Sequence, residues 1–88
     1  MKYFLGLDLG QTSDYSALVI AERLLAVDKG TYHLRHIERF PLGTPYPQVV
    51  EKVKQLVETP ALSGQCVLAI DATGVGAPVV DMFTAAQI

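Results

Sequence analysis

The sequence predicts a small α/β domain with a mixed sheet, in the order strand, strand, strand, helix, strand, helix. Three observations lead to this prediction. Short apolar runs alternate with turn residues over the first forty positions, which is typical of an antiparallel meander. Residues 45–59 then show the apolar periodicity of a helix. A last apolar run follows that helix, and a strand reached by a helical crossover usually lies parallel to an earlier one.

The composition fits one small domain. The chain has 88 residues, of which 50% are hydrophobic, and a formal net charge of -2. This hydrophobic content argues against disorder, and the charge gives no sign of the basic face that usually accompanies nucleic-acid binding. Cys66 is the only cysteine, which excludes an intramolecular disulfide and favours a reduced, cytoplasmic setting. No apolar run is long enough to cross a membrane and no signal peptide is evident, so we expect no membrane partner.

The first three predicted strands come from the first forty residues. Residues 2–9 form the first strand, and because both of its faces are largely apolar we expect a central strand covered on both sides. Residues 16–25 form the second strand, and Asp-Lys-Gly at 28–30 is a turn signal. Residues 31–40 form the third strand, whose charged side chains place it near an edge of the sheet.

The second half of the chain predicts two helices around one strand. Thr44 is expected to cap the first helix, with Pro45 at its first helical position. This helix, over residues 45–59, carries a single apolar stripe. Residues 66–71 form the fourth strand, and Pro78 suits the first turn of a second helix.

Two of the predicted strands end in an aspartate, Asp8 and Asp71. If these strands are parallel neighbours, both carboxylates lie at the same edge of the sheet. Mg²⁺ and Mn²⁺ prefer oxygen ligands, so the pair is a candidate metal site. Plainer interpretations remain open, because Asp8 could be an exposed strand-end acid and Asp71 could cap the following turn. Asp14 lies in the turn after the first strand and is more typical of a turn residue than of a ligand.

Three segments resemble the nuclease domain of phage terminase large subunits, which has a ribonuclease H-like fold. They read GLDLGQTSDYSALVI at 6–20, HIERFPLGTPYP at 36–47 and AIDATGVGAPVVD at 69–81. The likeness spans most of the chain. It implies that residues 1–88 form a partial, truncated ribonuclease H-like nuclease domain.

The resemblance also implies an activity. Asp8 and Asp71 match the first two catalytic, metal-binding acids of that family, and Asp14 matches a further acid with an auxiliary role. The implied reaction is hydrolysis of DNA phosphodiesters with two Mg²⁺ or Mn²⁺ ions during phage DNA packaging. The implied partners are double-stranded DNA and other phage packaging proteins, in a bacterial host. The family takes a third acid from a later element that this sequence lacks, so a fragment that is inactive alone is also expected.

Two other classes of function remain open. ATP-binding domains of the actin, Hsp70 and sugar-kinase group begin with D-x-G-x-T, which Asp8, Gly10 and Thr12 imitate. A non-catalytic remnant or assembly module would keep the fold without a complete site. Nucleotide binding would single out the former, and an absence of metal binding would favour the latter. We also expect the chain to expose an apolar face or sheet edge through which a homo-oligomer can form.

Overall fold

The structure, a computed structural model, describes residues 1–11, 13–24 and 30–88. Within these ranges the chain forms a four-stranded mixed sheet and two helices, in the predicted order. The elements are β1 (Tyr3–Asp8), β2 (Ala17–Arg23), β3 (Tyr32–Arg39), α1 (Tyr46–Val57), β4 (Cys66–Asp71) and α2 (Ala77–Ala85). No helix of the described part is long and apolar enough to cross a membrane. The turn expected at 28–30 lies, except for Gly30, outside the described residues.

The sheet has the strand order β3-β2-β1-β4. β1 pairs with β2 antiparallel and with β4 parallel, which confirms that β4 returns beside the first strand. β2 and β3 are antiparallel, and the register shifts between Ile20 and Ala21 so that Arg35 is the extra residue on β3. The central place of β1 and the edge position of β3 agree with the sequence prediction.

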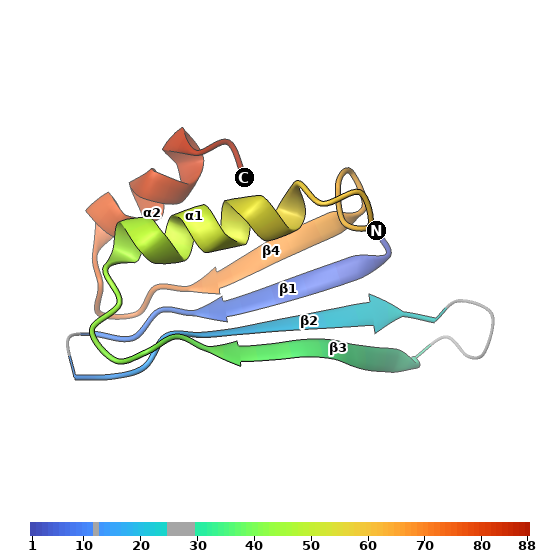
Figure 1. Cartoon of the computed structure of the whole chain (residues 1–88), viewed down its shortest axis with the longest axis horizontal. Helices are drawn as coiled ribbons and strands as arrows, with labels where there is room; N and C mark the ends of the chain where they lie inside the picture. Colours follow the sequence, from blue (N-terminus) through green and yellow to red (C-terminus); the bar gives the residue numbers. More distant parts are fainter. Residues whose placement is uncertain (12, 25–29) are drawn as a thin grey trace.

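Both helices cover the same face of the sheet (Figure 1). The core lies between them and the strands, and the predicted apolar stripe of α1 is confirmed by the burial of Val49, Val50 and Val53. On the sheet, Leu5 and Leu7 of β1 and Leu18 of β2 are at most 2% exposed. Their alternation with more exposed residues is the period-two pattern of strands with one covered face.

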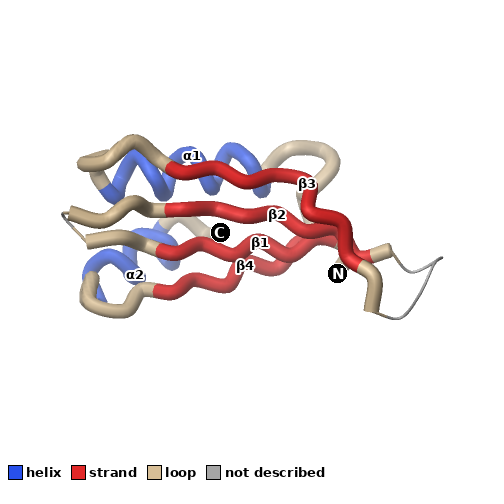
Figure 2. The backbone as a smooth tube through the Cα atoms, turned by 90° about the horizontal axis from the view of Figure 1, so that it is seen from below, coloured by secondary structure: helices blue, strands red, loops and turns tan. Residues whose placement is uncertain are grey.

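The other face of the sheet has no helix over it, as Figure 2 shows from that side. The prediction that β1 is covered on both sides is therefore wrong for the described chain. Phe4 and Gly6 lie on the open face and are only half-buried, and Asp8 is exposed. The error has a simple origin, because a sequence apolar on both faces of a strand does not show which face receives the helices.

The predicted cap of α1 is also wrong. Pro45, with φ -61° and ψ 143°, occupies the cap position, and no side chain caps the helix. The Thr44 hydroxyl instead donates a hydrogen bond of 2.6 Å to the Pro41 carbonyl oxygen. It closes the loop before the helix, and the helix begins at Tyr46. Pro78 lies in the first turn of α2, as predicted.

Candidate functional site

Asp8 and Asp71 lie side by side on the open face. They are direct register partners at the ends of the parallel strands β1 and β4. Neighbouring strands are about 4.8 Å apart, so the two carboxylates are within reach of a common ligand. Leu7 and Leu9, on either side of Asp8, are buried on the helix side, which directs Asp8 away from the core. The structure thus brings together the two acids that the sequence predicted as metal ligands.

The two acids border a shallow hollow in the open face. Small residues form much of its lining, namely Gly6, Ala17 and Ala69. Val19 forms a wall, because a Cβ placed on Gly6 would lie 3.2 Å from Val19 Cγ2. Both acids therefore border open space at this hollow.

The carboxylate of Asp71 is held in place by Thr73. Its Oδ1 accepts hydrogen bonds from the Thr73 hydroxyl at 2.7 Å and from the Thr73 backbone N–H at 3.0 Å. Both bonds lower the pKa of Asp71 from its ordinary value, and the bond from the Thr73 hydroxyl has the larger effect. The turn-capping interpretation of Asp71 is therefore confirmed, and it leaves Oδ2 without a hydrogen-bond partner among the described residues. Asp-x-Thr is a common turn pattern, so the spacing could have indicated the role of Thr73.

Asp8 has neither a hydrogen bond nor an ion pair to any side chain of the described ranges. Its carboxylate lies exposed at the end of β1. A carboxylate without a protein partner next to a second, oriented carboxylate can bind a cation with little rearrangement.

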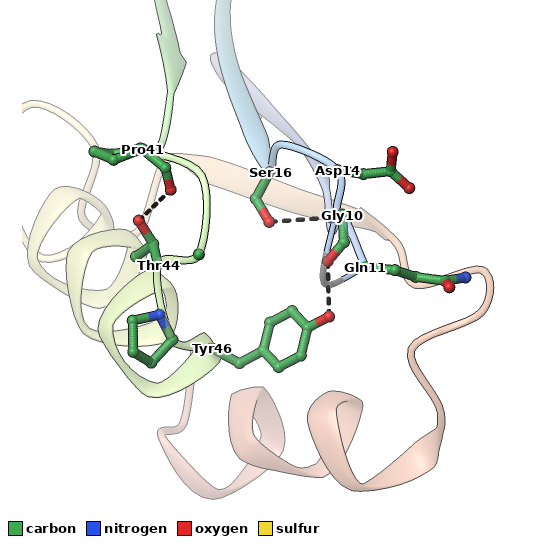
Figure 3. A pocket seen from close by; sticks show the side chains of 9 residues that line it. Gly10, Gln11, Asp14, Ser16, Pro41, Thr44 and Tyr46 are labelled. Carbon is green, nitrogen blue, oxygen red and sulfur yellow. Dashed lines mark hydrogen bonds between the residues drawn. The ribbon is translucent and has the colours of Figure 1, made fainter.

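Asp14 does not line this hollow. It lines a separate pocket of about 200 Å³ between the turn after β1 and the loop before α1. In Figure 3 its side chain points away from the Tyr46 hydroxyl. Here Tyr46 Oη donates to the Gly10 carbonyl oxygen at 2.7 Å, and the Gly10 N–H donates to Ser16 Oγ at 3.0 Å. The Tyr46 contact could not be predicted from the sequence, because it joins residues that are 36 positions apart.

The turns after β1 and β4 meet beside the acids. Gly74 has φ +82°, and a Cβ there would collide with the side-chain amide of Gln11. Gly76 caps α2 with φ +86° and ψ 164°, a conformation that is nearly restricted to glycine. Gly74 thus allows the close approach of the two turns, and the positive φ of both glycines lets the chain turn sharply after β4. Thr12, part of the nucleotide-type pattern, lies outside the described residues.

Two histidines, one cysteine and one arginine, which could in principle serve a site, lie outside the lining of the hollow. His36 Nε2 is 2.9 Å from Glu38 Oε1, while His33 is exposed, so neither histidine adds a ligand to the hollow. Cys66 is half-buried, and burial raises the pKa of its thiol, as expected of a packing residue. Arg39 lies with its guanidinium carbon 4.2 Å from the ring centroid of Tyr15.

The acid pair fits a hard divalent cation in part. Across the described chain, no group of three or more His, Cys, Asp or Glu side chains gathers to hold a metal ion. Mg²⁺ is nevertheless often bound by one or two carboxylates, with water and substrate phosphates completing its shell. Two adjacent carboxylates, one of them oriented by Thr73, suit such a site for a single ion. A second ion would need a further acid.

Comparisons with protein-family models, with curated proteins and with solved structures found no match to this chain.

Proposed function

We propose that this chain is the acid-bearing part of a ribonuclease H-like, terminase-type nuclease domain that acts on double-stranded DNA with divalent cations. The observation that carries the proposal is the register of Asp8 with Asp71 on adjacent parallel strands. The order of strands and helices supports it, since the first and fourth strands present the acids at the same end of the sheet.

Asp8 and Asp71 would have different roles in such a site. When bound, a divalent cation polarises the phosphodiester and supplies an activated water. Asp71, whose pKa is lowered by Thr73, offers an ionised carboxylate in a fixed orientation at neutral pH. Asp8 offers a carboxylate that no side chain of the described part engages. The phosphate would approach from the open face, where no helix covers the acids.

This arrangement sets an expectation for activity. Two carboxylates provide for one cation, and the third acid of the resembled family is absent from the sequence. Asp81 lies on α2 and Asp14 lines another pocket, so neither completes the pair. We therefore expect the chain to bind the metal and to cleave DNA only where a further acid completes the site.

Titration of Mn²⁺ into the chain by calorimetry tests the proposal. We expect binding that is lost in Asp8→Asn and in Asp71→Asn, because each removes one of the two charges facing the ion. Asp14→Asn is the matched control and should bind as the wild type does. Retained affinity in both variants would overturn the site. An absence of binding in the wild type would leave the non-catalytic assembly module as the better description.

A further inference from the structure

The open face of the sheet carries apolar side chains over its middle part. Several large side chains on this face are exposed to solvent, among them Ile37 (66% exposed) and Leu34 (57% exposed). They come from all four strands, since Phe4 of β1, Val19 of β2 and Val67 of β4 share this face with them. Exposed apolar surfaces of this kind mark a contact with another molecule.

The strand register arranges this face in rows that cross the sheet. Reading from β3 to β4, the first row holds charged side chains at both ends, and the next two rows are apolar. The rows are Arg39-Ala17-Asp8-Asp71, Ile37-Val19-Gly6-Ala69 and Leu34-Ala21-Phe4-Val67. The middle row is large on the β3 side and small on the β4 side, and the hollow lies at its small end.

We propose that this face packs against the same face of a second copy of the chain, about a two-fold axis parallel to the strands. Such a rotation keeps each row opposite itself and reverses its order, so β3 of one copy lies over β4 of the other. Ile37 then meets Ala69, and Val19 meets Gly6. Large side chains face small ones throughout the middle row, and Ile37 enters the hollow. Two aligned sheets with their strands close to parallel are a common packing arrangement.

The charged row supports the same axis. The rotation places Arg39 of one copy opposite Asp71 of the other, beside Asp8, and symmetry makes this contact twice. Neither Arg39 nor Asp8 has an ion-pair partner in the described ranges of its own chain. Facing sheets are about 10 Å apart, a gap that an arginine and a carboxylate can bridge.

This inference does not rest on the proposed function. It uses the shape and charge of the face, whereas metal binding uses only the two carboxylates. The dimer would cover Asp8 and Asp71, so metal binding and dimerisation would exclude one another on this face.

Sedimentation velocity over a series of concentrations tests the dimer. We expect the wild type to dimerise and Ile37→Glu to raise the dimer dissociation constant about tenfold or more, because the glutamate enters the hollow beside the like charges of Asp8 and Asp71. Leu42→Glu is the matched control, since Leu42 is 52% exposed in the loop before α1 and lies off this face. Ala69→Leu, which fills the hollow on the opposite edge strand, should weaken the dimer as well. A wild type that stays monomeric at all concentrations, or equal effects of Ile37→Glu and Leu42→Glu, would overturn the proposal.

A charge exchange tests the axis. Arg39→Glu and Asp71→Arg should each weaken the dimer about tenfold, since each places like charges opposite one another. The double variant restores opposite charges in the two-fold contact and should recover most of the affinity. A double variant no tighter than the weaker single variant would overturn the strand-parallel axis. Circular dichroism of each variant separates lost contacts from lost folding.

Discussion

The hydroxyl of Tyr46, in the first turn of α1, donates a hydrogen bond of 2.7 Å to the carbonyl oxygen of Gly10, just after β1 (Figure 3). The N–H of the same glycine donates to Ser16 Oγ at 3.0 Å. Both backbone polar groups of Gly10 are thus engaged. The end of β1, where Asp8 lies, is fixed to the helix layer through this one residue.

We predict that Tyr46→Phe lowers the free energy of unfolding by about 1 kcal/mol, because the change leaves the Gly10 carbonyl without this donor. The free energy is measured by urea unfolding. Tyr32→Phe is the control, since Tyr32 is 50% exposed and its hydroxyl has no partner among the described residues. Equal effects of the two substitutions would show that the Tyr46 hydrogen bond contributes nothing of its own.

We predict that Gly10→Ala destabilises the chain by roughly 2 kcal/mol, within the range of overpacking substitutions. A Cβ at Gly10 would press into the backbone carbonyl oxygens of Asp14 and Tyr15, which cannot rotate away as a side chain could. Gly30→Ala is the matched control, because a Cβ there would meet no atom of the described residues within 4 Å. Thermal unfolding midpoints of the two variants provide the comparison, and a midpoint for Gly10→Ala equal to that of the control would contradict this account of the turn.

The order of elements could be predicted from the sequence because each has a strong local signal. The apolar stripe of α1 and the run from Cys66 to Asp71 predicted their elements, and the crossover rule placed β4 parallel to β1. The pairing of Asp8 with Asp71 followed from these two facts. It needed no side-chain detail, because the acids end strands that lie next to each other.

Features that depend on distant residues could not be predicted. Which face of β1 receives the helices is decided by the paths of α1 and α2, and β1 itself is apolar on both faces. The hydrogen bond from Thr44 to the Pro41 carbonyl oxygen could not be predicted either. A threonine that precedes a proline at the start of a helix is equally suited to capping that helix. The self-complementary order of the open-face rows appears only once the register of all four strands is known.

Glu22 makes folding stability depend on pH. It is 7% exposed and receives Arg35 Nε at 2.7 Å on Oε1 and Lys2 Nζ at 3.4 Å on Oε2. The Arg35 hydrogen bond is the main cause that lowers the pKa of Glu22, against the opposing effect of burial. A carboxylate whose pKa is lower in the folded state than in the unfolded state stabilises the fold at higher pH. That contribution is lost as the pH falls through the folded-state pKa.

We therefore predict that the urea midpoint of the wild type is lower at pH 3 than at pH 6. The loss of stability should begin near the ordinary glutamate pKa of about 4. Glu22→Gln should be less stable than the wild type at pH 7, because Arg35 and Lys2 lose their charged partner. It should also show a smaller fall with pH. Glu51→Gln, at an exposed position of α1, is the control. Parallel pH profiles for the wild type and Glu22→Gln would assign the pH dependence to other carboxylates.

The two proposals for the open face lead to a joint prediction, because both use the carboxylates of Asp8 and Asp71. If the dimer places Arg39 against them, each copy must release its ion before dimerising. Free Mn²⁺ at ten times its own dissociation constant should then raise the dimer dissociation constant roughly a hundredfold, one factor of about ten for each copy. Sedimentation in Mn²⁺, compared with NaCl of equal ionic strength, separates this competition from charge screening.

Asp8→Asn should keep the Arg39–Asp71 contact and lose the response to Mn²⁺. If calorimetry shows that the chain binds Mn²⁺ but the dimer dissociation constant does not change with Mn²⁺, the acids lie outside the interface.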